Sequence, residues 1–305
     1  MVLSACGPTA APTTTSIASD QTITTATVGV DGFPVTIEAA TGPLTLDEPP
    51  AAIVSLSPTA TEMLFAIDAG DRVVAADEFS DFPPEAPTTD LSGFTPNVEA
   101  IASYAPDLVI ASFDPGDLVS SLATLDIPVI LQDGAVTIDD TYAQLAQLGQ
   151  VTGQADEAEQ VIAAMKSEID TIVAGLPTEA QGLTYYHELD QNFFTATSTT
   201  FIGQMYARLG LVNIADEADP DGFGYPQLSA EYIIDRDPQL IFLADTICCG
   251  QNATTVAARP GWENLRAVAN GDVIELDDSL ASRWGPRVVD FLEIVSGAVA
   301  QALTG

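Results

Sequence analysis

A long helical stretch, residues 139–176, separates two parts of the chain that follow a different pattern. After Gln154 its apolar residues recur in steps of three and four, as on one face of a helix. At about 1.5 Å per residue this face would extend over ~33 Å, about the length of a domain. Gly149 and Gly153 predict a kink or junction near its start. Because such a rod fixes how the flanking parts are connected, it constrains the fold more than any other feature.

Short apolar strands alternate with helices on both sides of this rod. Before it, the predicted strands are 52–56, 73–76, 107–111 and 128–131, with helices at 58–69, 98–102 and 118–125. After it, the predicted strands are 183–187, 240–244 and 273–276, with helices at 201–209, 230–234, 261–269 and 285–303. Short links in such an alternation indicate a parallel sheet covered by helices. The predicted fold class is α/β: two Rossmann-like lobes with mainly parallel sheets, joined by one long backbone helix.

The same pattern divides the chain into four parts. We expect a flexible segment over residues 1–34, an N-terminal α/β lobe over 35–140, a connecting helical segment over 141–176 and a C-terminal α/β lobe over 177–305. The N-terminal lobe begins with a predicted pair of strands around a turn at 35–46. Two sheets facing each other across a rigid connector leave a ligand cleft between the lobes, at the carboxyl ends of the strands.

The charge of the chain excludes several partners. Asp and Glu number 44 against 8 Lys and Arg, which gives a formal net charge of -36. Such a chain repels nucleic acid and anionic membrane surfaces at long range. Because 47% of the residues are hydrophobic, the chain is nevertheless not an acidic disordered one. The acids are spread over the whole chain, which is consistent with a saline habitat where salt screens their repulsion.

The first residues resemble a bacterial lipobox. In Leu3-Ser4-Ala5-Cys6, Cys6 would become the lipidated first residue after cleavage, although the charged and long apolar parts of a signal peptide do not precede it. The alternative is a chance tetrapeptide. Residues 7–27 are mostly Thr, Ala, Ser and Pro, which is typical of a flexible tether. We therefore expect an extracytoplasmic protein that is attached to the cell membrane only through a lipid anchor.

Few residues offer covalent or metal chemistry. The single histidine, His187, excludes sites built from several imidazoles, and the sequence has no GxSxG, GxxxxGK[ST], GxGxxG or CxxC motif. We predict no enzymatic activity, no cofactor and no directly bound metal. Cys248 and Cys249 are adjacent, and they form either a vicinal disulfide or two free thiols. An imidazole at a strand end is ordinarily hydrogen-bonded, although His187 could also approach the metal of a chelate as an axial ligand.

Aromatic and polar residues gather in the loops that follow the predicted strands. Several aromatics converging on one cleft indicate a bulky, partly apolar ligand. Against the acidic background, Arg283 is a candidate for binding a ligand carboxylate or phosphate, whereas Arg287, one turn later, is better explained by a structural ion pair. The predicted ligand-binding residues are Ser57, Thr59, Phe94, Phe113, Glu188, Tyr225, Asp245, Arg283 and Trp284.

Four segments together resemble one known family. Residues 53–62, 79–86, 106–110 and 225–231 are similar, in order and spacing, to the helical-backbone class of ABC-transporter substrate-binding proteins. The resemblance covers about 35–303 and includes the long connecting helix. It implies a monomeric receptor that captures a corrinoid, a ferric siderophore or haem and delivers it to a dimeric ABC permease. Of these ligands the resemblance places the corrinoid first, the siderophore close behind and haem third.

The vitamin B12-binding branch of that class is the most similar. By resemblance, Phe94 and Tyr225 would face the corrin, and Glu99 and Glu231 would dock onto arginines of the permease, whose docking face should be basic. The alternative for both acids is a favourable interaction with a helix N-terminus. The chain departs from the branch in having Phe94 in place of Trp and in lacking its widely spaced cysteine pair. Two rivals from other classes are a carboxylate-based extracellular hydrolase and a passive adhesion or scaffold lipoprotein.

Overall fold

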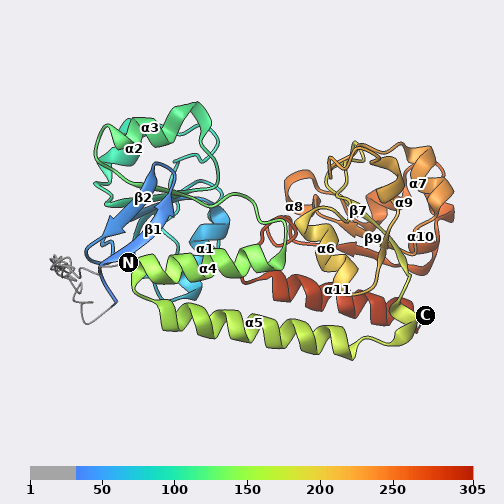
Figure 1. Ribbon diagram of the computed structural model, residues 1–305. Coiled ribbons are helices and arrows are strands. Elements are labelled where there is room, and N and C mark those ends of the chain that lie inside the picture. Colours follow the sequence, from blue (N-terminus) through green and yellow to red (C-terminus); the bar gives the residue numbers. More distant parts are fainter. Residues whose placement is uncertain (1–31, 305) are drawn as a thin grey trace, which may run out of the picture.

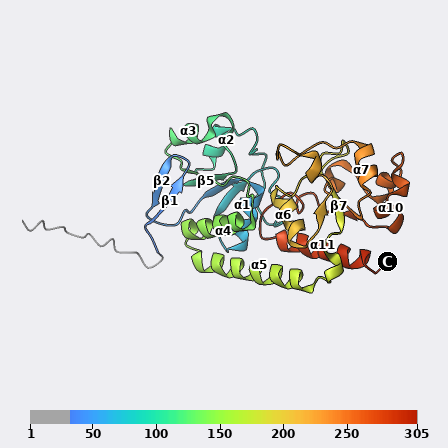
Figure 2. The same ribbon diagram turned by 45° about the vertical axis from the view of Figure 1, so that its right-hand side comes forward.

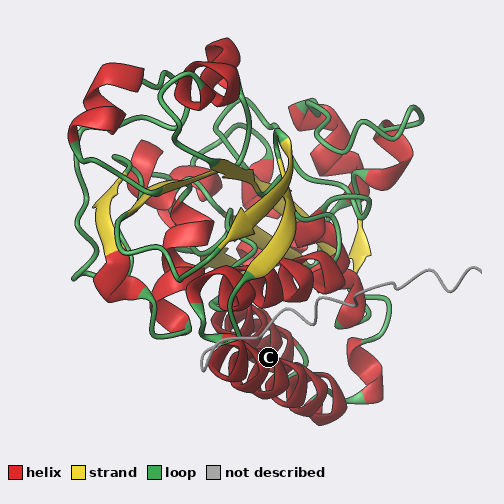
Figure 3. Cartoon of the chain, turned by 60° about the vertical axis from the view of Figure 1, so that its left-hand side comes forward, coloured by secondary structure: helices red, strands yellow, loops and turns green. Residues whose placement is uncertain are grey.

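The computed structural model describes residues 32–304 and contains two α/β lobes side by side (Figure 1). The predicted lipobox with Cys6 and nearly all of the predicted tether lie outside the described residues. Each lobe contains a four-stranded parallel sheet, and helices lie on both sides of the strands (Figure 3). The prediction of two parallel-sheet lobes is confirmed. Among residues 32–304, no helix is both long and apolar enough to cross a membrane.

The N-terminal lobe has the strand order β4-β3-β5-β6. All four residues of β3 and of β5 are buried, as expected for central strands covered on both faces. A separate antiparallel hairpin, β1-β2, lies against this lobe and contacts α4 and β6. The elements are β1 Val35–Ala39, β2 Gly42–Leu46, β3 Ile53–Leu56, α1 Pro58–Ala66, β4 Val73–Ala76, α2 Val98–Ser103, β5 Leu108–Ala111, α3 Leu118–Ala123 and β6 Val129–Leu131.

The C-terminal lobe has the strand order β10-β9-β7-β8. Its elements are β7 Thr184–Glu188, α6 Phe201–Arg208, β8 Val212–Asn213, α7 Ala230–Arg236, β9 Leu240–Leu243, α8 Thr246–Cys249, α9 Ala253–Ala257, α10 Arg266–Asn270, β10 Val273–Glu275 and α11 Val288–Ala302. The short elements β8, α8 and α9 were not predicted. The single helix predicted at 261–269 is wrong: Leu265 has extended backbone angles and divides it into a 3-10 turn, Trp262–Asn264, and α10.

The connecting segment consists of two helices rather than one continuous rod. Helix α4, Ile138–Thr152, ends at Gly153, whose φ of 72° is the left-handed conformation that glycine adopts at helix ends. The chain then folds back, and α5, Ala155–Gly175, packs against α4. A Cβ atom at Gly149 would lie 2.5 Å from the Cβ of Ala158, so glycine permits this close approach. Only α5 runs beneath both lobes, where α11 lies beside it (Figures 1 and 2).

The hydrophobic core is shared between the lobes. One cluster of buried side chains joins Ile53 and Leu64 of the N-terminal lobe, Leu145 and Met165 of the connecting helices, and Phe291 of the C-terminal lobe. The opposite faces of the two sheets have separate clusters. Because the shared cluster is continuous, moving one lobe against the other would disturb a close-packed interior. The lobes are therefore held in one arrangement by packing as well as by the chain.

A candidate ligand-binding cleft between the lobes

Two neighbouring cavities lie between the lobes at the carboxyl ends of the strands. The N-side cavity, of about 480 Å³, is lined mainly by loops of the N-terminal lobe, and the C-side cavity, of about 410 Å³, mainly by loops of the C-terminal lobe. Both are lined by Ser282 and Trp284 from the loop before α11. Six of the nine residues predicted to bind ligand line the N-side cavity and two line the C-side cavity, with Trp284 in both. They are Ser57, Thr59, Phe94, Phe113, Arg283 and Trp284 in the first and Tyr225 and Trp284 in the second.

Trp284 is held in place at this boundary by helix α4. Its indole Nε1 donates to Oε1 of Gln144 at 2.9 Å, and its carbonyl oxygen accepts from Oγ1 of Thr141 at 2.8 Å. Its ring lies close to Gly134, where an added Cβ would be 3.6 Å from the ring. The aromatic wall between the two cavities is therefore fixed by hydrogen bonds to the connecting helices.

Each lobe presents exposed aromatic rings at the cleft. In the N-terminal lobe, the ring centre of Phe94 lies 5.8 Å from that of Phe79 and 5.3 Å from that of Phe113. In the C-terminal lobe, the rings of Phe223 and Tyr225 are 6.4 Å apart. Phe94 is 62% and Phe223 76% exposed, which is unusual for large apolar side chains gathered in one region. Phe79 and Phe223 were missed as candidates, although each stands in a strand-end loop.

Polar groups line the inner part of the N-side cavity. Ser57 caps α1 through its hydroxyl, which accepts from the backbone N–H of Ala60 and from the Ser112 hydroxyl at 2.8 Å. Asp77, at the end of β4, accepts from the Ser80 hydroxyl at 2.6 Å. Burial raises the pKa of the Asp77 carboxyl above its ordinary value. Hydroxyl and carboxyl groups here can hydrogen-bond the polar edge of a ligand whose body rests on the aromatic rings.

Arg283 binds carboxylates of the protein itself. Its Nη1 donates to Glu62 at 2.7 Å, and its Nη2 lies 2.7 Å from Asp81 and from the carbonyl oxygen of Phe79. Arg287 donates to both oxygens of Glu62, as expected for a structural ion pair. Arg283 lines the cavity, but the prediction that it offers a free charge to an anionic ligand group is corrected, because its charge is neutralised within the protein.

Glu188 and Asp245 do not line either cavity, which corrects their prediction as ligand contacts. Both side chains are fully buried at the ends of β7 and β9. Glu188 accepts two hydrogen bonds from Arg259, at 2.6 and 2.5 Å, and Arg259 lies over the ring of Trp262. Burial and the nearby Glu188 raise the pKa of Asp245 to about 7. The partly buried Arg259, 71 residues from Glu188 in the chain, holds the Glu188 carboxylate inward, whereas the carboxylate of Asp245 is buried without a hydrogen-bond partner among the described residues.

His187 lies in the wall of the C-side cavity. Its Nδ1 shares a hydrogen bond of 2.9 Å with the hydroxyl of Tyr206, as expected for an imidazole at a strand end. Its Nε2 is buried without a hydrogen-bond partner among the described residues. Burial lowers the pKa of His187 to about 4, so the imidazole is neutral at ordinary pH.

The two acids predicted to dock onto a permease occupy equivalent positions in the lobes. Glu99 is the second residue of α2, which Asn97 caps, and Glu231 is the second residue of α7, which Ser229 caps. Both side chains are exposed. Helices α2 and α7 lie on the side of the molecule away from α5 (Figures 1 and 2). One flat partner could therefore contact both acids, while the interaction of each with its helix N-terminus remains compatible with the structure.

Two α/β lobes on a helical backbone, with an aromatic-lined cleft between them, define a two-lobed ligand-binding protein. A family model described as periplasmic binding protein matches residues 53–280. A cobalamin-binding protein of Halobacterium salinarum is 32% identical over 269 residues, covering 85% of this chain and 72% of that protein. The chain belongs to the periplasmic binding protein family, which confirms the resemblance inferred from its sequence.

Two further relatives support the same assignment. An uncharacterised ABC transporter substrate-binding lipoprotein of Bacillus subtilis is 28% identical over 291 residues, covering 92% of this chain and 90% of that protein. The crystal structure of the periplasmic vitamin B12-binding protein of Vibrio cholerae superposes with a TM-score of 0.67 at 26% identity, covering 84% of this chain and 99% of that one.

Removing the charge of Glu62 should destabilise the folded protein strongly. In Glu62→Gln the buried Arg283 and the partly buried Arg287 lose their shared carboxylate, and breaking a buried pair in this way typically costs about 3–5 kcal/mol. Urea denaturation would measure the change in the free energy of unfolding. As a control, Glu217→Gln breaks an exposed pair with Arg236 and should change the stability little. Equal effects of the two substitutions would contradict the importance of the buried pair.

Asp245 should make the stability fall as the pH rises from about 4 to about 7. The folded chain keeps a proton on Asp245 up to a pKa of about 7, whereas the unfolded chain releases it near 3.8. Because the folded state binds more protons in this window, its free energy of unfolding decreases with rising pH. Asp245→Asn should remove this contribution. The free energy of unfolding of the variant, minus that of the unsubstituted protein, should therefore rise as the pH increases across the window.

The measurement is the difference between urea denaturation curves of the two proteins from pH 4 to pH 8. The difference is needed because His187, with its lowered pKa, changes the stability in the opposite direction between about pH 4 and 6.5. A difference that stays constant across the pH range would show that Asp245 does not titrate as inferred.

Proposed function

We propose that this protein is the extracytoplasmic substrate-binding component of an ABC importer and that it holds a corrinoid between its lobes. The observation that carries the proposal is the pair of exposed aromatic groups, Phe79-Phe94-Phe113 and Phe223-Tyr225, on opposite sides of two cavities that meet at Trp284. Flat macrocycles gain contact area from such rings. The similarity to a cobalamin-binding protein and to a vitamin B12-binding protein supports the choice of ligand.

The charge in the cleft favours a corrinoid over anionic chelates. Among the described residues that line the cavities, Arg283 is the one permanent cation, and Glu62 and Asp81 neutralise it. Asp77 and Asp278 add carboxyl groups to the N-side cavity. An anionic siderophore, or haem with its two propionates, would meet no free positive charge there. The amide groups around a corrin ring can instead hydrogen-bond the hydroxyls of Ser57, Thr59 and Ser112.

The proposal includes delivery to a membrane permease and anchoring by lipid. Glu99 and Glu231 would contact basic residues of the permease dimer, and Cys6 would carry the lipid outside the cytoplasmic membrane. The family, and a relative described as a substrate-binding lipoprotein, support this placement. We propose that the receptor acts as a monomer and without covalent chemistry. His187 has a free, neutral Nε2 in the wall of the C-side cavity, so the proposal keeps it as a candidate axial ligand.

Ligand titration tests the proposed substrate directly. The purified protein would be titrated with cyanocobalamin, haemin and ferric hydroxamates, following tryptophan fluorescence and visible absorbance. We expect cyanocobalamin to bind most tightly, and Phe94→Ala and Tyr225→Ala each to weaken it by roughly tenfold or more, as for central residues of an interface. Tyr104→Ala, in the C-terminal turn after α2 and outside both cavities, is the control. Absence of binding by all three chelates at micromolar concentration would refute the receptor function.

Transport tests the docking acids separately from binding. The double variant Glu99→Ala with Glu231→Ala should impair ligand uptake by cells that carry the cognate permease, while its ligand affinity stays unchanged. The matched control removes two exposed acids from α5 on the other side of the molecule, Glu159→Ala with Glu168→Ala, and should transport normally. If the first variant lost ligand affinity together with uptake, Glu99 and Glu231 would be structural residues.

A further inference from the structure

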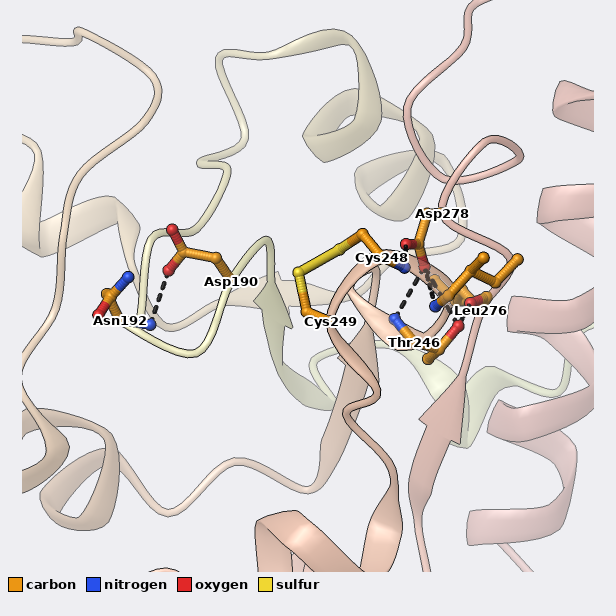
Figure 4. Close-up of a disulfide and its surroundings, with 8 residues drawn as sticks. Asp190, Asn192, Thr246, Cys248, Cys249, Leu276 and Asp278 are labelled. Atoms are coloured by element: carbon orange, nitrogen blue, oxygen red, sulfur yellow. Dashed lines mark hydrogen bonds between the residues drawn. A yellow bond between two sulfur atoms is a disulfide. The ribbon is translucent and has the colours of Figure 1, made fainter. Parts of the chain in front are cut away.

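The adjacent cysteines form an exposed disulfide on a very short helix. Cys248 and Cys249 are the last two residues of the four-residue helix α8, and the structure joins them by a disulfide (Figure 4). Both residues are exposed, as is the neighbouring Ile247. A helix of four residues cannot hold itself together, because too few hydrogen bonds repay the ordering of its backbone. The conformation of α8 therefore depends on the disulfide and on its contacts with the rest of the lobe.

Those contacts converge on one carboxylate, Asp278. Its Oδ1 accepts from the backbone N–H groups of Thr246 and Ile247 at 2.8 and 3.0 Å, and its Oδ2 from that of Cys248 at 2.6 Å. The Thr246 hydroxyl lies 3.1 Å from the same carboxylate and donates to the carbonyl of Leu276 at 2.6 Å (Figure 4). The position of Asp278 and the conformation of α8 consequently depend on each other.

Asp278 connects α8 to the cleft. It lines the N-side cavity together with Ser279 and Trp284. The Ser279 hydroxyl accepts from Nη2 of Arg283 at 3.1 Å and lies 3.2 Å from Asp81, which belongs to the other lobe. An exposed disulfide is thus connected, through α8 and Asp278, to a wall of the cavity and to the ion pairs between the lobes.

We propose that Cys248–Cys249 is a redox modification site that a small dithiol reduces, and that reduction loosens Asp278 and weakens ligand binding in the N-side cavity. The part concerning the ligand rests on the proposed function. The disulfide closes a ring across a single peptide bond and limits the backbone rotations on either side of that bond. In the reduced protein, α8 must be ordered each time a ligand enters the N-side cavity, and the conformational entropy lost in this ordering opposes binding.

The chemistry is an ordinary thiol–disulfide exchange. A thiolate of the dithiol attacks the sulfur of one cysteine, forming a mixed disulfide and releasing the other cysteine as a thiolate, which takes a proton from water. The second thiol of the reagent then attacks the reagent sulfur in the mixed disulfide and releases the remaining cysteine. The protein gains two electrons and two protons, and the dithiol leaves as a cyclic disulfide. Because both cysteine residues are exposed, a small dithiol can reach the disulfide.

A first experiment needs no ligand. In a Cys6→Ser background these are the only two cysteines of the chain, so thiol counting should give none before and two after treatment with dithiothreitol. Hydrogen exchange measured by mass spectrometry should then become faster in residues 246–249 and also in residues 277–284. Reoxidation should reverse both changes. The variant Cys248→Ser with Cys249→Ser should show the fast exchange from the start and should not respond to dithiothreitol.

A second experiment measures the affinity for cyanocobalamin in the oxidised and reduced states. We expect reduction to weaken binding by about fivefold or more, the lower end of ordinary coupling between sites. Faster exchange confined to residues 246–249, an affinity that does not change, or a pair that never forms a disulfide under oxidant would each overturn the proposal. If cyanocobalamin does not bind at all, the corrinoid assignment fails, while the exchange experiment still decides whether the disulfide controls Asp278.

Discussion

The arrangement of the two lobes depends on the ion pairs of the buried Glu62 carboxylate. This carboxylate comes from α1 of the N-terminal lobe and accepts hydrogen bonds from Arg283 and Arg287, which precede α11 of the C-terminal lobe. Removing three such charges from water is costly, and the cost is offset only where several well-directed hydrogen bonds form together. The geometry that forms them also sets the spacing of the lobes, and the continuous core around α5 supports the same spacing.

A cleft held in this way is largely formed before any ligand arrives. Trp284 follows Arg283 directly, so the residues that fix the lobes also place the aromatic ring between the two cavities. Binding to a preformed cleft avoids much of the entropy lost when loops must be ordered. The ion pairs leave the cleft with little free positive charge. Which ligand fits then depends on apolar contact with the aromatic rings and on hydrogen bonds to the polar groups at the edge of the cleft.

Much of the fold could be predicted because its signals are local. Apolar runs such as Ile53–Leu56 and Leu240–Leu243 form buried strands, and the spacing of apolar residues after Gln154 marks the buried face of α5. The aromatics of the cleft could also be predicted, since residues that follow parallel strands gather at one edge of a sheet. Their place in the loops together with the family resemblance identified Phe94 and Tyr225, and the exposed Phe79 and Phe223 lie in the same loops.

The sequence by itself determined the two α/β lobes, the helical connection and the aromatic strand-end loops. The spacing of apolar residues and the positions of glycines determine helices, strands and turns within a few residues of the chain. Only the tertiary structure decided what the charged residues do. Arg259 turns Glu188 inward, and Glu62 takes up the charge of Arg283. These partners are 71 and 221 residues apart in the chain. Whether a charge faces a ligand or a buried counter-ion depends on contacts that form only when distant segments pack together.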